Sequence, residues 1–241
     1  MAKIKLALVG ANGRMGKEIC KLVAQNNRLE ATLAVLRNGE ASPFKNHLKS
    51  LESFEKSKKL DVVIDFSTRE QLQKTISYCI KNKTPLVTGV TGLSPNEIKR
   101  LEAAGKKIAI FYSANMSLGL ASLRAALSAL ASLQGFDFQI IEGHHIRKKD
   151  KPSGTAILLQ KELERVTKRK CPEPLSYRAG GIIGQHEVIA ASSGEVLRLS
   201  HEALDRGIFA QGTLRAVEFI VKACPGLYDM KDLVGEKIEK H

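Results

Sequence analysis

Short apolar segments alternate with helical patterns along the first 112 residues, and this alternation limits the fold more than any other feature. The apolar segments are nearly continuous, which is typical of strands that are buried on both faces. Strict alternation of strands and helices predicts the α/β class, with a doubly wound parallel sheet. We expect strands at residues 4–9, 30–36, 61–66, 85–88 and 108–112, and helices at residues 14–27, 68–82 and 94–105, the last capped by Ser94.

The pattern changes after residue 116, where β-rich segments replace the regular alternation. Helices are expected at residues 117–133, 153–168 and 213–224, and strands at residues 136–142, 186–191 and 195–201. Residues 37–59 are polar and irregular, and no element is predicted there.

Lys and Arg outnumber Asp and Glu by 38 to 25, so the net charge is +13. A strongly basic chain favours anionic partners, which include nucleic acids, lipids and small acids. The cations are scattered, and only 5% of the residues are aromatic, which leaves few platforms for stacking bases. We therefore expect no nucleic-acid partner. A 43% apolar content excludes disorder of the whole chain.

The four cysteines form no CxxC pair and no Cys/His cluster at zinc spacing. This predicts buried free thiols in a reducing compartment, and no metal site. The apolar segment near the N-terminus is too short for a signal peptide, and Arg124 interrupts the longest nearly uncharged stretch, residues 108–136. We expect a cytoplasmic protein without a membrane span.

Three glycines lie in the turn between the first expected strand and the first expected helix, within Gly10-Ala11-Asn12-Gly13-Arg14-Met15-Gly16. Glycines at such a junction let backbone N–H groups approach a pyrophosphate at the helix N-terminus. The turn therefore predicts dinucleotide binding, as in a Rossmann domain. The end of the second expected strand holds Leu36 and Arg37 where NAD-binding domains place a carboxylate, so the sequence favours NADPH over NADH.

Two further turns follow short apolar strands, and both are expected at the carboxyl edge of the sheet, where ligands bind. Their small residues suit a nicotinamide ring, and the Asn115 amide offers a donor and an acceptor. The turns are Thr88-Gly89-Val90-Thr91-Gly92 and Ser113-Ala114-Asn115-Met116-Ser117.

The segment from Glu142 to Thr155 places two histidines and several cations before an expected helix start. His144 and His145 are of a residue type that titrates near neutral pH and can donate a proton. The helix start, Pro152-Ser153-Gly154-Thr155, offers backbone N–H groups and hydroxyls to a carboxylate. Together these residues predict an acid-binding pocket with a proton donor.

These motifs resemble those of the 4-hydroxy-tetrahydrodipicolinate reductase (dihydrodipicolinate reductase) family, of diaminopimelate and lysine biosynthesis. The matching segments, in family order over nearly the whole chain, are GANGRMG (10–16), TGVTG (88–92), SANMSLG (113–119), EGHHIRKKDKPSGTA (142–156), RAGGIIGQHEV (178–188) and FAQGTLRA (209–216). The chain departs from the pattern at Leu36, where many relatives have an acid, and at Val90, where Thr is frequent.

The resemblance implies reduction of 4-hydroxy-tetrahydrodipicolinate, via dihydrodipicolinate, to tetrahydrodipicolinate by NAD(P)H. It also implies a Rossmann domain at residues 1–116 and 209–241, and a smaller α+β domain with a mixed sheet at residues 117–208 that binds substrate and builds a homotetramer. His144 would be the proton donor and acceptor, Lys148 a second proton donor, and His145, Gly154 and Thr155 would hold the carboxylates of a small dicarboxylate. The cofactor would contact Gly10, Ala11, Asn12, Gly13, Arg14, Met15, Arg37, Gly89, Val90, Thr91, Ser113, Ala114, Asn115 and Met116.

Two alternatives stay open at this point. The net charge permits a nucleic-acid-binding protein that senses a nicotinamide cofactor, with residues 147–151 as a phosphate-binding loop. The Rossmann half also permits an amino-acid or imine dehydrogenase with another substrate.

Overall fold

The computed structural model describes residues 2–36, 47–48 and 59–235. The chain forms two compact units, Met1–Ser117 with Gly207–His241, and Leu118–Arg206. Each unit has its own sheet and its own core.

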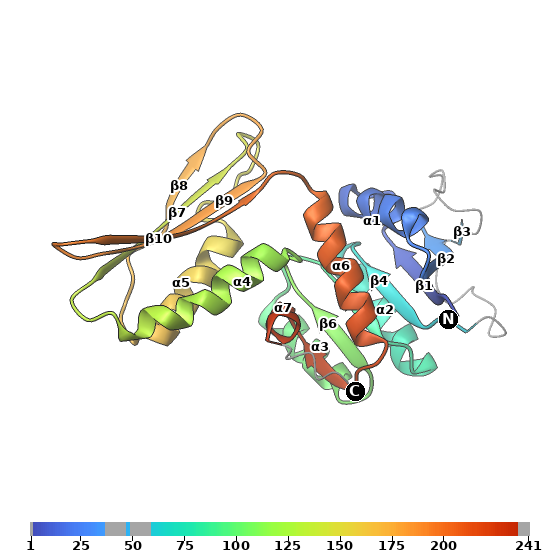
Figure 1. The fold of residues 1–241 in the computed structure, drawn as a ribbon. Helices are drawn as coiled ribbons and strands as arrows, with labels where there is room; N and C mark the ends of the chain where they lie inside the picture. Colours follow the sequence, from blue (N-terminus) through green and yellow to red (C-terminus); the bar gives the residue numbers. More distant parts are fainter. Residues whose placement is uncertain (1, 37–46, 49–58, 236–241) are drawn as a thin grey trace. The chain divides into compact units, whose positions relative to one another are not determined.

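The first unit is built on a parallel sheet, and the expectation of a doubly wound fold is confirmed (Figure 1). The sheet has the strand order β11-β6-β5-β4-β1-β2-β3, so the chain proceeds outward from β1 through β2 and then restarts on the other side with β4. A ligand site is expected where the strand order reverses in this way, at the carboxyl ends of β1 and β4. The strands are β1 (Ile4–Val9), β2 (Leu29–Val35), β3 (His47–Leu48), β4 (Val62–Asp65), β5 (Leu86–Thr88), β6 (Ala109–Tyr112) and β11 (Gly226–Tyr228).

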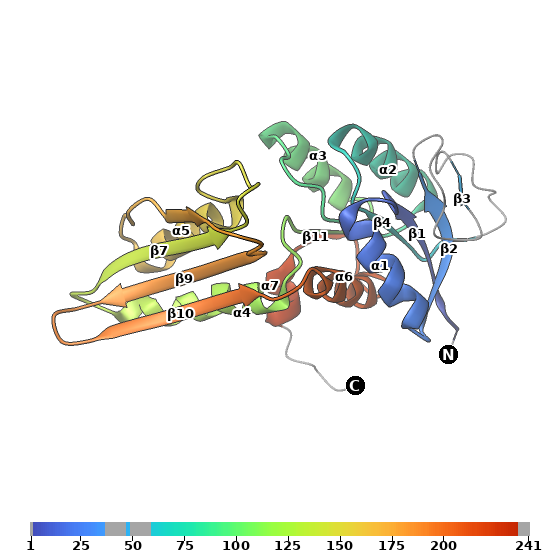
Figure 2. The same cartoon turned by 90° about the horizontal axis from the view of Figure 1, so that it is seen from above.

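Helices cover both faces of this sheet (Figure 2). Helices α2 (Arg69–Asn82) and α3 (Pro95–Gly105) pack together on one face, while α1 (Arg14–Gln25) and α6 (Gly207–Ile220) pack together on the other. The short α7 (Met230–Val234) lies against α6. Ser94 caps α3 in a reciprocal capping box with Glu97, which confirms the predicted start of this helix.

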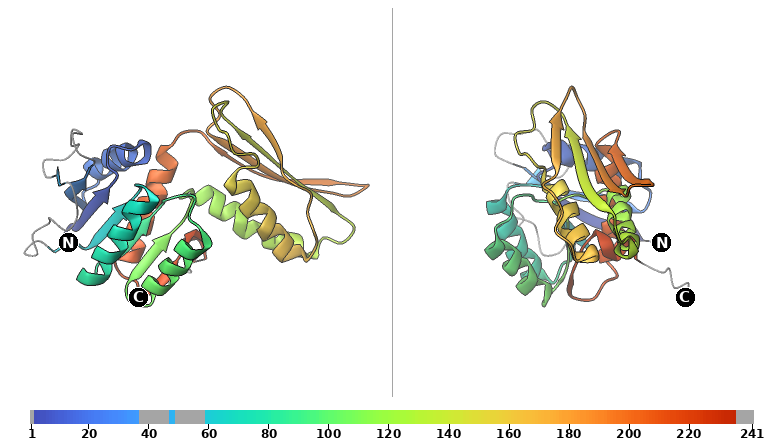
Figure 3. Two further views of the ribbon diagram at one scale, coloured as in Figure 1. Left: turned by 180° about the vertical axis from the view of Figure 1, so that it is seen from behind. Right: turned by 90° about the vertical axis from the view of Figure 1, so that its left-hand side faces the viewer.

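The second unit is a four-stranded mixed sheet of order β10-β9-β7-β8, with helices on one face (Figure 3). Strand β7 (Asp137–His144) pairs parallel with β8 (Leu175–Arg178) and antiparallel with β9 (Gly184–Ala191), and β10 (Val196–Ala203) pairs with β9. Alternate residues of β7 and β9, such as Ile140 and Val188, form a core with α4 (Leu118–Ala126) and α5 (Gly154–Thr167).

Several predicted elements differ from the structure. The helix expected at residues 117–133 divides into α4 and a 3₁₀ segment, η2 (Leu127–Ser132). Within η2 the hydroxyls of Ser128 and Ser132 bond to carbonyl oxygens three residues earlier, which competes with regular α-helical bonding. The last expected helix is α6, which begins earlier than predicted, at Gly207, and ends at Ile220.

Four short elements were not predicted: β3, β8, β11 and α7. Strand β3 lies in the stretch 37–59, most of which is outside the described residues. The cysteines are free, and Cys20 and Cys79 are buried as predicted. The prediction is wrong for Cys171, which is half-buried, and for Cys224, which is exposed beyond the end of α6. Among the described residues, no helix has the length and apolar character needed to cross a membrane.

Candidate functional site

Strand β7 carries Glu142 and His144 on the same side of the second sheet, because side chains two residues apart share a face. Both are buried, and the pairing of β7 with β8 sets Arg178 opposite His144. His144 was expected in a loop, but it is the last residue of β7. Its backbone is therefore fixed by the sheet.

The buried carboxylate of Glu142 contacts both His144 and Arg178. Arg178 donates to both oxygens of Glu142, at 3.0 Å to Oε2 and 2.8 Å to Oε1. His144 contacts the same Oε2 through Nδ1, and the backbone N–H of Ser153 donates to Oε1 at 3.2 Å. Burial alone would raise the pKa of Glu142, but the hydrogen bonds, those of Arg178 first, lower it to about 2.

Burial is the main influence on His144 and lowers its pKa below the usual value. The hydrogen bond and the charge of Glu142 act in the opposite direction, while Lys148 and Arg178 lower the pKa further. The other ring nitrogen of His144, Nε2, faces Gly184, where an added Cβ would lie 3.3 Å away. His144 is thus a buried imidazole balanced between one anion and two cations.

His186, on strand β9, lies next to His144. Its ring packs edge-on against that of His144, with 5.3 Å between the centroids, and its Nε2 lies 3.4 Å from the Ser153 hydroxyl oxygen. Burial, followed by the nearby His144 and His201, lowers the pKa of His186 to about 3. His186 is therefore neutral at physiological pH, and it was given no role from the sequence.

Lys148 lies in the loop that follows β7. Its ammonium group forms an ion pair with Asp150 at 2.8 Å, and its backbone N–H donates to the carbonyl of His145 at 3.0 Å. Arg178 also binds this loop, donating to the carbonyl oxygens of Lys148 at 3.3 Å and Asp150 at 2.6 Å. One guanidinium therefore ties the Lys148 loop to Glu142.

Helix α5 begins beside this cluster. Ser153 is its N-cap and accepts from the backbone N–H of Ala156 at 3.2 Å, so this hydroxyl serves the helix. Gly154 is exposed, and an added Cβ would meet no atom within 4 Å. The first turn holds no acidic residue, so the helix dipole suits an incoming carboxylate.

The glycine turn of the first unit lies at the switch point of the parallel sheet. Gly10 directly follows β1 and has a φ of +82°, and an added Cβ would lie 2.8 Å from the carbonyl oxygen of Phe66, next to β4. Gly16 packs so closely that a Cβ would lie 2.2 Å from the oxygen of Gly10. Gly13 is the N-cap of α1, whose first turn has no acidic residue. This geometry fits a dinucleotide pyrophosphate.

The two later turns also lie at the carboxyl edge of this sheet, after β5 and β6. Gly89 is in contact with the Phe66 ring, and Ser113 donates to the carbonyl of Asn115 at 2.7 Å. Val90 and Met116 are buried, so their side chains belong to the core. Arg37, proposed for cofactor selection, lies outside the described residues.

Thus each unit gathers its own group of predicted residues. The first gathers Gly10 to Met15 and the turns at residues 89–91 and 113–116; the second gathers His144, His145, Lys148, Gly154 and Thr155. Within the described residues, no three His, Cys, Asp or Glu side chains form a cluster suited to a metal ion.

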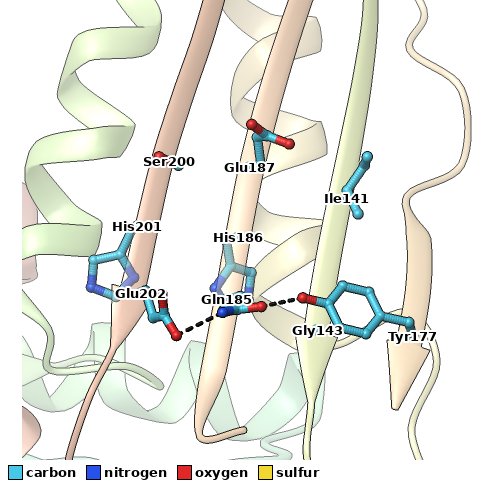
Figure 4. A pocket seen from close by; sticks show the side chains of 9 residues that line it. All are labelled: Ile141, Gly143, Tyr177, Gln185, His186, Glu187, Ser200, His201 and Glu202. Atoms are coloured by element: carbon cyan, nitrogen blue, oxygen red, sulfur yellow. Dashed lines mark hydrogen bonds between the residues drawn. The ribbon is translucent and has the colours of Figure 1, made fainter. Parts of the chain in front are cut away.

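A cavity of about 290 Å³ lies on the second unit's sheet (Figure 4). Tyr177 contacts Gln185, which donates to Glu202 at 2.6 Å, so a row of side chains crosses the strands. Tyr177, Gln185 and Glu202 alternate with the core residues and so belong to the face opposite α5. The residues predicted for proton transfer and substrate binding do not line this cavity. Its lining consists of Ile141, Gly143, Tyr177, Gln185, His186, Glu187, Ser200, His201 and Glu202.

Sequence reasoning missed two members of the buried cluster, Glu142 and Arg178. Both stand at the edges of motifs that drew attention for other residues. The partnership depends on the pairing of β7 with β8, and β8 was not predicted. Without that strand, nothing in the sequence placed residue 178 beside residue 142.

Comparisons with known proteins match both units. The model of the dihydrodipicolinate reductase N-terminus matches residues 4–116, and the model of its C-terminus matches residues 119–234. A 4-hydroxy-tetrahydrodipicolinate reductase from Bdellovibrio bacteriovorus is 45% identical over 240 residues, covering all of both chains. Another from Caldanaerobacter subterraneus is 39% identical over 96% of this chain and 98% of the relative.

A solved structure has the same fold. It is the dipicolinate-bound dihydrodipicolinate reductase from Paenisporosarcina sp. TG-14, with a TM-score of 0.82 and 23% identity, covering 94% of this chain and 97% of the other.

Proposed function

The chain belongs to the dihydrodipicolinate reductase family, whose members reduce 4-hydroxy-tetrahydrodipicolinate with NAD(P)H, and from this premise we propose that His144 and Lys148 supply the proton in that reduction. The observation that carries the proposal is the grouping of both residues around one buried ion pair, at the end of β7 and beside the start of α5. Membership makes the chain an oxidoreductase of lysine biosynthesis with a nicotinamide cofactor.

The reaction needs an acid and no protein nucleophile. A nicotinamide held by the first unit would supply a hydride to a carbon of the conjugated imine, and the enamine-like anion of the substrate would then need a proton at the neighbouring carbon. In the proposal His144 donates this proton and Lys148 acts as a second donor. Bringing a dianionic substrate to His144 favours its protonated form against the effect of burial.

We assign the carboxylates of the substrate to His145 and to Gly154 and Thr155 at the start of α5. Helix N-termini bind anions through their N–H groups and their dipole. Open space around Gly154 supports this assignment, since a ligand can approach the backbone there.

We assign the cofactor to the first unit, with its pyrophosphate at residues 10–15 and its nicotinamide end at residues 89–91 and 113–116. The tight backbone approaches at Gly10 and Gly16 support this assignment. We further propose that Arg37 pairs with the 2′-phosphate of NADPH, because Leu36 leaves no carboxylate beside it to bind the ribose of NADH.

The test follows oxidation of NADPH and NADH side by side, with 4-hydroxy-tetrahydrodipicolinate as substrate. Wild-type protein should oxidise NADPH faster, and Arg37→Ala should weaken NADPH binding by about 10-fold or more while changing NADH little. An equal loss for both cofactors would give Arg37 a structural role. No oxidation of either cofactor by folded protein that binds nucleotide would refute the reaction itself.

We also propose a homotetramer assembled through the second unit. The sheet face opposite α5 exposes apolar side chains, among them Leu175, Tyr177 and Val196. Exposed apolar strands favour contact with another subunit. Light scattering should give about four times the chain mass of 26.4 kDa, and a monomer would contradict the proposal.

A further inference from the structure

We infer that Glu142 and Arg178 position the proton-donating apparatus: Glu142 fixes the ring of His144 through Nδ1, and Arg178 holds Glu142 and the Lys148 loop together. This inference deepens the proposed role of His144 and rests on it. It assigns to the two buried residues a positioning role and no contact with substrate.

The contact with Glu142 fixes the tautomer of His144. Ionised Glu142 only accepts hydrogen bonds, so Nδ1 of His144 must carry the hydrogen that faces Oε2. The neutral ring then leaves Nε2 without a hydrogen, and the protonated ring carries the transferable proton there. A buried acceptor on one ring nitrogen thus defines which nitrogen exchanges the proton.

Several hydrogen-bond donors hold the Glu142 carboxylate in place. Its two oxygens accept from His144, from two nitrogens of Arg178 and from the backbone of Ser153. The side chain is fully buried. A buried carboxylate held by this many donors stays ionised and has no freedom to rotate away from His144.

Arg178 bonds to Glu142 and also to the loop that holds Lys148. Its side chain is 5% exposed, and beyond Glu142 it donates to the carbonyl oxygens of Lys148 and Asp150. The carboxylate that holds the His144 ring and the backbone of the Lys148 loop are therefore bound to the same guanidinium, while the Lys148 ammonium group itself pairs with Asp150. Lysine has no planar fork and cannot make these bonds together.

The decisive variant is Glu142→Gln. In the wild type Oε1 accepts from Arg178 and Ser153, so the single amide oxygen of Gln should take that place and its NH₂ should face His144. The NH₂ group donates, so Nδ1 of His144 must then accept and the ring hydrogen moves to Nε2. Loss of the carboxylate also lowers the pKa of His144, because the hydrogen bond and charge of Glu142 raise it while the charges of Lys148 and Arg178 lower it. The other titratable groups nearby are His186, which packs against the ring, and Asp150, which pairs with Lys148.

The experiment measures the pH dependence of kcat and the ¹⁵N shifts of His144. In Glu142→Gln the alkaline limb of kcat should move down by about one to three pH units, and kcat at neutral pH should fall by about 10-fold or more with little change in KM. The neutral tautomer should change from Nδ1–H to Nε2–H. The same limb and the same tautomer as in the wild type would overturn the inference.

A matched control is Glu162→Gln. Glu162 is a buried carboxylate of the same unit, on α5, and it pairs with Arg165 at 2.7 Å and Arg124 at 3.9 Å. Its variant should lose stability but keep the wild-type pH profile. A similar shift of the profile in this control would reduce Glu142 to a general structural role and overturn the inference.

The ¹⁵N measurement also separates this inference from the proposed function. The wild-type spectrum needs neither turnover nor a folded variant. An Nε2–H tautomer in the wild type would overturn the inference whatever the activity, whereas an Nδ1–H tautomer in an inactive protein would support the positioning and refute only the reaction.

Discussion

At the scale of residues, the sequence predicts which candidate site residues lie close together only where they share one segment. His144, Lys148 and Gly154 stand in one short segment, so their proximity follows from the sequence itself. Glu142 and Arg178 meet only through strand pairing, at a separation of 36 residues. Residues that act within one loop can be predicted from a motif, and residues that act across strands need the register.

Gly154 provides a test of the substrate assignment. Gly154→Val should raise KM for 4-hydroxy-tetrahydrodipicolinate by about 10-fold or more, because the side chain would occupy the approach to the helix start. The thermal midpoint should stay close to that of the wild type, since a Cβ there meets no atom within 4 Å. Steady-state kinetics and thermal unfolding measure the two effects. An unchanged KM would place the carboxylate elsewhere.

At the scale of elements, the long and regular ones followed from periodicity and capping. The five expected strands of the first half and its three helices are present, with ends shifted by a few residues. Strands β8 and β11 have only four and three residues, and their partners lie far away in sequence. Such strands exist because of tertiary pairing, and their own residues carry too little pattern to predict them.

The start of α3 tests the capping argument. Ser94→Ala removes the hydroxyl that accepts from the Glu97 backbone, and it should lower the free energy of unfolding by about 1 kcal/mol. In the wild type, hydrogen bonds with Ser94 and Arg69 lower the pKa of Glu97 to about 2. The same change should therefore raise the pKa of Glu97. Urea unfolding and NMR titration measure these effects.

Ser77→Ala is the control for that experiment. Ser77 is an exposed residue within α2 whose hydroxyl bonds to the carbonyl of Gln73. Its loss should change stability by no more than about 0.5 kcal/mol. If both variants lost the same stability, the cap would have no special role.

At the scale of the whole molecule, each of two units gathers one group of predicted residues: the turns proposed to bind cofactor are in one, and the segment proposed to bind the acid is in the other. Alternation in the first half predicted its sheet, because buried parallel strands have a clear pattern. The mixed sheet was expected only from the family resemblance. Its strand β9 alternates between buried and half-buried residues, a weaker signal in the sequence than a continuous apolar segment.

Acid sensitivity of the whole chain should depend in part on His186. Its pKa is about 3 in the folded protein and about 6.5 when unfolded, so unfolding takes up a proton between these values. Stability should therefore fall as the pH is lowered from about 6.5, by about 1.4 kcal/mol per unit from this group. His186→Gln should remove that contribution.

Urea unfolding of both proteins between pH 6.5 and 4.5 measures the difference. The free energy of unfolding of the wild type, minus that of His186→Gln, should decrease steadily as the pH drops. Parallel curves for the two proteins would show that His186 has the same pKa in both states.

Proton delivery by His144 and Lys148 is tested most directly by single-turnover and steady-state oxidation of NADPH in His144→Ala and Lys148→Ala. Each variant should lose about 100-fold or more in kcat while binding NADPH with the wild-type dissociation constant. Near-normal turnover in both variants, with the same substrate, would contradict the account.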